Sequence, residues 1–128
     1  LTEAEWEYAC RAGTTTQWRF GGGESGLQEY AWYDKNSAGH AQSVGQKRAN
    51  AFGLHDMHGT VREWCSDWYG SYGKSAEVDP AGPASGSSRV VRGGGWRSVP
   101  HFVRAGFRSL FVPGSRYDDV GFRVCSAS

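Results

Sequence analysis

The residue types best suited to chemistry gather in the stretch GLHDMHGTVREWC, residues 53–65. Asp56 and Glu63 bracket a glycine-containing turn, and the backbone carbonyls of Gly59 and Val61 lie between them in the sequence. Carboxylate and carbonyl oxygens are the ligands that Ca²⁺ prefers in proteins. The spacing therefore predicts a calcium site at Asp56, Gly59, Val61 and Glu63. The alternative is structural: Asp56 caps a turn and Glu63 pairs with an arginine.

Other arrangements with catalytic or metal-binding potential are weak. His55 and His58 flank Asp56, but a zinc site needs a third and a fourth ligand, and no suitable His or Cys stands nearby. The chain contains no Walker phosphate loop and no nucleophile elbow. Cys65 lies in an aromatic stretch, where we expect a buried and inert thiol. Three cysteines are too few for a disulfide framework, and the sequence is compatible with one disulfide or with none.

Size and charge limit the function classes. The 128 residues predict a single domain, 1–128. A net charge of +1 and a pI near 7.9 argue against bulk attraction to nucleic acid. No apolar run approaches the ~20 residues that a membrane span needs. The 19 glycines and 14% aromatic residues predict many turns and short strands around a compact aromatic core.

Regular elements are predicted mainly at the two ends of the chain. Thr2 and Glu5 form a capping-box pattern, and Trp6, Ala9 and Cys10 share one face, so residues 2–12 should form a helix. Short strand-like segments follow at residues 88–94, 102–108 and 119–125. One helix and a few strands among long loops indicate an α+β protein.

The C-terminal segment has an unusual composition. Residues 1–96 contain 21 Lys, Glu, Gln, Met and Trp residues in total, whereas residues 97–128 contain none of these five types. The same segment is rich in Phe, Arg and Ser. A short segment of strands and turns is naturally poor in Lys and Glu, which explains part of this bias.

Five blocks of the sequence resemble the formylglycine-generating enzyme (sulfatase-modifying factor) family. They span nearly the whole chain in the family's order: LTEAEWEYACRAG, FGLHDMHGTVREWCSDWY, DPAGPASGSSRVVRGGGW, VRAGFR and VGFRVC. The resemblance implies a C-type-lectin-like α+β fold of the formylglycine-generating-enzyme subtype, with a small antiparallel sheet and long ordered loops. Members of the family normally carry further sequence before the first block, so we expect that part to be missing here.

The resemblance also bears on metals and on catalysis. The family's calcium site falls on the same four positions, Asp56, Gly59, Val61 and Glu63. Some members join a helix cysteine, here Cys10, to one near the C-terminus, but Cys125 is one residue later than the family's position, so this pairing stays open. The family's oxidases bind copper through a cysteine pair after the glycine turn. The segment RSVPHFVRAGFR contains no cysteine, so we expect neither copper nor this oxidation.

The family's fold also occurs in the variable proteins of diversity-generating retroelements, and the C-terminal composition resembles theirs. In those proteins randomised AAY codons become NNY codons, which cannot encode Lys, Glu, Gln, Met or Trp. A matching framework of Arg, Gly, Trp and Pro residues runs through 92–123, and the residues between are all NNY-encodable. The predicted ligand-binding residues are Arg97, Ser98, Val99, His101, Phe102, Phe107, Ser109, Leu110, Phe111, Val112, Gly114, Ser115, Tyr117, Asp118 and Asp119.

These residues have the character of a binding surface. Phe102, Phe107, Phe111 and Tyr117 offer large rigid contact area, and the Ser and Gly residues offer adaptable polar contacts. The sequence therefore predicts a non-catalytic domain that binds an unknown ligand, expected to be a protein, at the cell surface or outside the cell. Two alternatives stay open: an oxidoreductase or sulfatase-maturation enzyme of diverged chemistry, and Phe107 and Phe111 as ordinary core residues.

Overall fold

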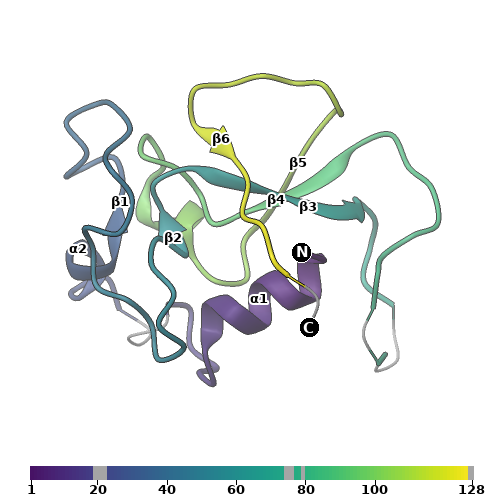
Figure 1. The fold of residues 1–128 in the computed structure, drawn as a ribbon, viewed down its shortest axis with the longest axis horizontal. Helices are drawn as coiled ribbons and strands as arrows, with labels where there is room; N and C mark the ends of the chain where they lie inside the picture. Colours follow the sequence, from purple (N-terminus) through teal and green to yellow (C-terminus); the bar gives the residue numbers. More distant parts are fainter. Residues whose placement is uncertain (19–22, 74–76, 79, 127–128) are drawn as a thin grey trace.

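The computed structural model describes residues 1–18, 23–73, 77–78 and 80–126. Within these ranges the regular elements are short and long loops join them (Figure 1). Their bounds, in chain order, are α1 Glu3–Arg11, α2 Leu27–Tyr30, β1 Ala31–Trp32, β2 His58–Gly59, β3 Arg62–Trp68, β4 Arg89–Arg92, the 3-10 helix η1 Pro100–Val103, β5 Arg108–Phe111 and β6 Val120–Gly121.

The main sheet has the strand order β5-β4-β3-β6. Strands β5, β4 and β3 are antiparallel neighbours, whereas β6 runs parallel to β3 at the edge. The predicted α+β class is correct, and the small sheet is antiparallel except for this edge strand. A separate pair of short strands, β1 and β2, is parallel.

The predicted N-terminal helix is confirmed as α1. The Thr2 hydroxyl accepts a hydrogen bond from the Glu5 amide, and the Glu5 carboxylate accepts one from the Thr2 amide, which completes the capping box. The helix ends at Ala12, whose backbone is left-handed, and Gly13 follows with φ of 90°. Trp6 and Cys10 face the core, as their spacing predicts.

The predicted strands at residues 88–94 and 119–125 correspond to β4 and β6, whereas the strand predicted at residues 102–108 was wrong. Residues 102–108 were expected to form a strand, but Pro100 starts the 3-10 helix η1 and the strand begins only at Arg108. Proline fixes φ near −65° and suits the first position of a helical turn, which explains the shift. The alternating stretch 62–68, which forms β3 at the centre of the sheet, was not predicted as a strand.

Apolar side chains form two buried clusters. One lies between α1 and the sheet and contains Trp6, Cys10, Met57, Cys65, Val90 and Ala105. The other lies beside α2 and contains Trp18, Leu27, Ala31 and Val103. All three cysteines are free thiols, Cys10 and Cys65 buried and Cys125 exposed, so Cys10 and Cys125 form no disulfide here.

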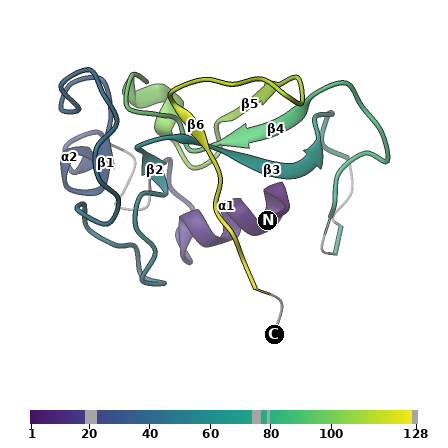
Figure 2. The ribbon, with the colours of Figure 1, turned by 45° about the horizontal axis from the view of Figure 1, so that its top comes forward.

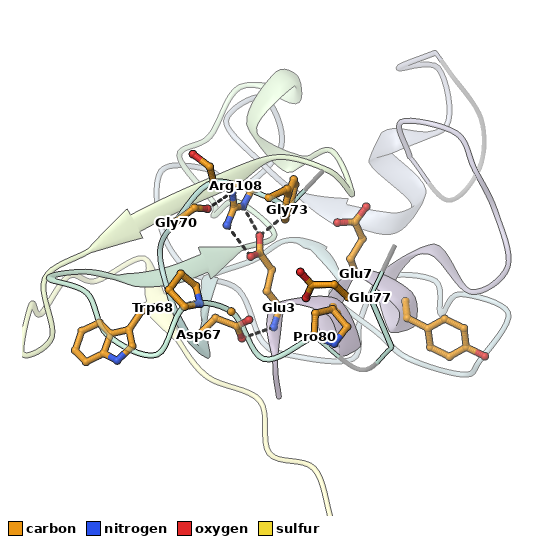
Figure 3. A pocket seen from close by; sticks show the side chains of 15 residues that line it. Glu3, Glu7, Asp67, Trp68, Gly70, Gly73, Glu77, Pro80 and Arg108 are labelled. Carbon is orange, nitrogen blue, oxygen red and sulfur yellow. Dashed lines mark hydrogen bonds and ion pairs between the residues drawn. The ribbon is translucent and has the colours of Figure 1, made fainter. Parts of the chain in front are cut away.

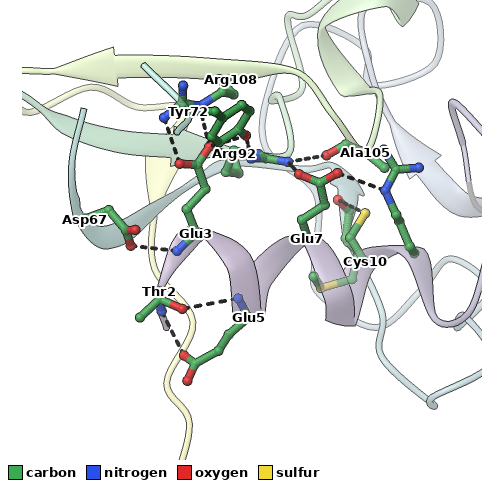
Figure 4. A network of polar contacts seen from close by, with 12 residues as sticks. Thr2, Glu3, Glu5, Glu7, Cys10, Asp67, Tyr72, Arg92, Ala105 and Arg108 are labelled. Atoms are coloured by element: carbon green, nitrogen blue, oxygen red, sulfur yellow. Dashed lines mark hydrogen bonds and ion pairs between the residues drawn. The ribbon is translucent and has the colours of Figure 1, made fainter. Parts of the chain in front are cut away.

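A buried arginine joins α1 to the sheet (Figure 4). Arg92 of β4 is 1% exposed and donates to the Glu3 carboxylate at 2.6 Å, to the Glu7 carboxylate at 2.5 Å and to the Ala105 carbonyl at 2.6 Å. Arg108 of β5 donates to both Glu3 oxygens at 2.6 and 2.9 Å. Two carboxylates on one helix face are thereby held by arginines from two neighbouring strands.

The charges of this network support one another. Burial alone raises the pKa of the Glu7 carboxyl, but hydrogen bonds and charges from Arg92 and Arg11 outweigh burial and leave that pKa below its ordinary value. The charged form of Glu7 is therefore favoured in the fold, and this contribution to stability is lost as the pH falls through the lowered pKa.

Replacing Arg92 by leucine should destabilise the fold strongly. The substitution removes one arginine partner from the buried Glu3 and from the half-buried Glu7, which keep only Arg108 and Arg11. Breaking a buried ion pair costs about 3–5 kcal/mol. The free energy of unfolding in urea measures the effect. Arg48→Leu is the matched control, because Arg48 and Glu29 form a pair in which both side chains are more than half exposed. Its cost should stay below about 1 kcal/mol, and an equal loss in both variants would disprove the special role of Arg92.

Candidate functional site

The two faces of the main sheet have different roles. Glu63, Arg92 and Arg108 point from three strands toward α1, where they contact Trp6, Glu3 and Glu7. Their neighbours in the strands point the other way because successive side chains of a strand alternate. Figure 2 shows α1 on one side of the sheet and the connection from β5 to β6 on the other. We call the side away from α1 the outer face.

A pocket of about 360 Å³ opens on the outer face. Arg62 of β3, Val91 of β4 and Ser109 of β5 contribute to its floor, and the loop after β4 and η1 contribute its walls. We call it the outer pocket. Its lining residues are Arg62, Val91, Arg92, Gly93, Gly94, Arg97, Ser98, Phe102, Phe107 and Ser109. Five of them belong to the ligand-binding residues that the sequence predicts.

The glycine turn after β4 brings η1 against the sheet. Gly94 has φ of 66°, and a Cβ there would lie 2.6 Å from the Phe102 carbonyl oxygen and from a Val103 methyl carbon. Both the backbone angle and the space require glycine at this position. The turn fixes the backbone at Phe102, so the Phe102 ring stands at the rim of the outer pocket, where it is 43% exposed.

Two groups of rings lie on the outer face. His101, Phe102 and Phe107 contact one another, with ring centroids 4.8–5.7 Å apart. Phe111 contacts Tyr117 at 4.8 Å and Trp64 of β3 at 6.0 Å. None of these rings belongs to the two buried clusters. Phe107 and Phe111 are half-buried against the sheet and are not ordinary core residues.

Most of the predicted ligand-binding residues lie at the surface. The exposed ones are Arg97, Val99, His101, Phe102, Leu110, Val112, Gly114, Tyr117 and Asp118. Partly buried are Phe107, Ser109, Phe111 and Ser115. They come from the loop after β4, from η1, from β5 and from the connection to β6. Along β5, Ser109 and Phe111 lie on the outer face, whereas Leu110 shares the α1 side with Arg108.

Two of the predicted residues are buried and support the surface instead of forming it. The Ser98 hydroxyl accepts from the Gly95 amide at 2.9 Å, and the Ser98 carbonyl accepts from the Asp34 amide. Asp119 is 1% exposed and its carboxylate accepts from Arg62 at 2.5 Å. A buried carboxylate needs such a partner. Ser98 also lines the outer pocket, and direct contact of Ser98 or Asp119 with a ligand stays a prediction.

Arg62 is a residue of this surface that the sequence reasoning missed. It lines the outer pocket, and its guanidinium lies 4.8 Å from the centre of the Phe111 ring. The residue types in REWCSDW do not alternate between apolar and polar, so they carried no strand signal. Only the alternating burial along β3 places Arg62 and Trp64 on one face.

The carboxylates at the predicted calcium positions have protein partners. Asp56 accepts from the Gly45 amide at 2.8 Å and from the Thr60 hydroxyl at 3.0 Å. Glu63 accepts from the Trp6 indole at 2.7 Å and from Arg123 at 2.9 and 3.1 Å. These contacts match the structural alternative, and calcium at Asp56, Gly59, Val61 and Glu63 stays a prediction.

The other groups with metal-binding or nucleophilic character are also enclosed. His58 is 3% exposed, and burial is the main cause that lowers its pKa to about 4. The Cys10 sulfur lies 3.7 Å from His58 Nε2, and burial raises the pKa of the Cys10 thiol to about 12. Within the described ranges no three His, Cys, Asp or Glu side chains gather as metal ligands would.

A larger pocket, of about 710 Å³, lies on the α1 side of the sheet. Figure 3 shows Glu3 and Arg108 facing each other at its centre, with Glu7 and Glu77 on one side and Trp68 on the other. Its central charges already belong to the network around Arg92, because Arg108 and Arg92 neutralise Glu3. It contains none of the predicted ligand-binding residues.

Comparisons with known proteins agree with the fold. The family model of the sulfatase-modifying factor enzyme 1-like domain matches residues 1–128. The formylglycine-generating enzyme of Streptomyces coelicolor is 37% identical over 98% of this chain and 45% of its own length. A serine/threonine-protein kinase of Chlamydia caviae is 42% identical over 95% of this chain and 20% of its own length. The chain thus spans from a fifth to just under half of these relatives.

Solved structures give the same result. Variable protein 1 of Treponema denticola superposes with a TM-score of 0.89 at 42% identity, covering 94% of this chain and 44% of that one. PvdO from Pseudomonas aeruginosa superposes with a TM-score of 0.83 at 33% identity, covering 95% of this chain and 49% of that one. Together with the match along the full length, these similarities show that the chain belongs to the formylglycine-generating-enzyme (sulfatase-modifying factor) family.

Proposed function

We propose that this chain is a non-catalytic binding domain whose outer face is diversified by a retroelement and binds a protein ligand. The observation that carries the proposal is the coincidence of two independent patterns. The residues after Trp96 avoid five residue types, and thirteen of the fifteen NNY-encodable positions singled out from the sequence lie exposed or half-buried at the surface.

The chemistry of the exposed C-terminal residues supports binding. Phe102, Leu110, Val112 and Tyr117 are 43–61% exposed, and several such large apolar side chains in one segment are typical of a surface that a partner covers. Rigid rings beside small polar residues are typical of surfaces that bind proteins. The similarity to a protein named variable protein 1 supports the same conclusion.

The alternative is an enzyme of the same family, because several relatives are named formylglycine-generating enzyme. An oxidase that binds copper through thiolates needs cysteines beside its substrate. Residues 97–123 contain no cysteine, and the buried Cys10 and Cys65 have thiol pKa values raised to about 12, mainly by burial. Both thiols are buried in the core between α1 and the sheet, so neither is placed to hold copper beside a substrate.

The gene's surroundings test the retroelement directly. We expect the flanking DNA to contain a near-copy of the last ~100 bases of the coding sequence, with adenines at the variable codons, next to a reverse-transcriptase gene. Sequencing the flanks provides the measurement. If neither element is present, the retroelement part of the proposal is wrong.

Exposed positions of the C-terminal segment should tolerate change on either side of the sheet. Leu110→Ala should lower the free energy of unfolding by less than about 1 kcal/mol, because Leu110 is 43% exposed. Leu27→Ala is the matched control: Leu27 is fully buried and the same substitution there should cost about 2–5 kcal/mol. Urea unfolding of both variants provides the comparison. A cost at Leu110 as large as that at Leu27 would assign the segment to the core.

Metal analysis of the purified protein separates the binding domain from the enzyme. We expect no stoichiometric copper or iron, because the described residues offer no cluster of His, Cys, Asp or Glu. Calcium stays a prediction from the family resemblance. One equivalent of bound calcium would show that Glu63 binds the ion in place of Arg123. Stoichiometric copper or iron would favour the enzyme.

A further inference from the structure

The outer pocket has an excess of positive charge. Three arginines and no carboxylate line it. The Arg92 side chain turns to the other face, where Glu3 and Glu7 neutralise it. Arg62 and Arg97 are therefore the charges that a ligand in the pocket would meet.

Arg62 uses few of its hydrogen-bond donors. A guanidinium carries five N–H donors. One of its terminal nitrogens donates to Asp119 at 2.5 Å, while its Nε is buried without a hydrogen-bond partner. The Phe111 ring packs against the guanidinium at 4.8 Å and restricts its position. Arg62 is thus held in place with donor capacity to spare.

Arg97 is held by weaker contacts. Its side chain is 52% exposed, lies over the Trp96 ring and pairs with Asp118, which is 71% exposed. Its Nε lies 3.6 Å from Asp119, so both arginines share this one buried carboxylate. Exposed ion pairs are worth about 0–1 kcal/mol, so a ligand can displace Asp118 from Arg97 at little cost. Arg62, Arg97 and Asp119 together then carry one excess positive charge.

The aromatic walls of the outer pocket favour a ligand with an apolar or aromatic group beside its charge. Phe102 and Phe107, with ring centroids 4.8 Å apart, line the same pocket as the two arginines. The volume of about 360 Å³ accommodates a side chain or another small group. A ligand that places a negative charge on the arginines therefore places its neighbouring atoms against aromatic rings.

We propose that the outer pocket receives a carboxylate carried beside an apolar or aromatic group of a protein partner. This inference rests on the binding function proposed above and names the chemistry of its ligand. A carboxylate matches both the single excess charge and the planar donor fork of arginine, whereas a phosphate dianion brings more charge than the site balances. An acidic group on a protein surface is complementary to this pocket, because the described lining presents Arg62 and Arg97 and contains no carboxylate.

Three small probes of similar shape test the proposal on the full chain. Phenylacetate carries the carboxylate, phenylacetamide is its neutral counterpart, and phenyl phosphate carries a dianion. Titration at neutral pH and low salt, followed by NMR signals of the arginine Nε–H groups, should show phenylacetate binding at least about tenfold more tightly than phenylacetamide. The signals of Arg62 and Arg97 should shift. Equal binding of phenylacetamide, or tighter binding of phenyl phosphate, overturns the proposal, and the second result would indicate a phosphate-bearing ligand such as nucleic acid.

Two variants with opposite expected effects keep the test independent of folding. Arg97→Gln removes one of the two charges and should weaken phenylacetate binding about tenfold. Asp118→Asn removes the competing carboxylate and should strengthen binding severalfold. Arg48→Gln is the control, because Arg48 pairs with Glu29 outside the pocket, and it should leave binding unchanged. An unchanged affinity in Arg97→Gln, or a weaker one in Asp118→Asn, rejects the assignment.

Failure of this inference can be told apart from failure of the proposed function. If the probes do not bind while the template copy and reverse-transcriptase gene are present and Leu110 tolerates alanine, the display function stands and only the carboxylate pocket is wrong. If the template is absent and Leu110 behaves as a core residue while phenylacetate still binds, the pocket stands and the diversified surface is wrong.

Discussion

The whole arrangement depends on the buried Arg92 and its two helix carboxylates. Glu3 and Glu7 are one helical turn apart on α1, and Arg92 bonds both and also the Ala105 carbonyl, which lies just before β5. Arg108 of β5 adds a second pair to Glu3. Loss of one partner of a buried ion pair strongly destabilises a fold, so these contacts fix α1 to one face of the sheet. The residues on the side of the sheet that faces α1 can therefore change little without loss of stability.

That constraint leaves the outer face free. Alternation along β3, β4 and β5 sends Glu63, Arg92 and Arg108 toward α1 and Arg62, Val91 and Ser109 toward the outer pocket. Stability and recognition thus use different side chains of the same strands. Loops on the outer face can change sequence without touching the ion pairs beneath, which is the property that a diversified binding surface requires.

The sequence predicted elements whose signals are local and missed contacts that depend on distant partners. The capping box of Thr2 and Glu5 predicted α1 because both residues lie within one turn. Glu63 and Asp56 looked like calcium ligands because only their spacing was visible, whereas Arg123, sixty residues later, and the Gly45 amide supply their partners. Arg62 was missed for the same reason, since Asp119 and Phe111 are far from it in the chain.

At Asp119, the range of residues that an NNY codon can encode is wider than the range that the structure tolerates. An NNY codon can encode Asp, yet the Asp119 carboxylate is buried and holds Arg62, so most substitutions there would remove the ion-pair partner of an arginine beside the outer pocket. Ser98 is limited in the same way by the Gly95 amide that it caps. In the proposed diversified segment, stability is therefore expected to select against variation at the buried positions, and the ligand is expected to select variation at the exposed ones. Burial separates the two kinds, and residue type alone does not.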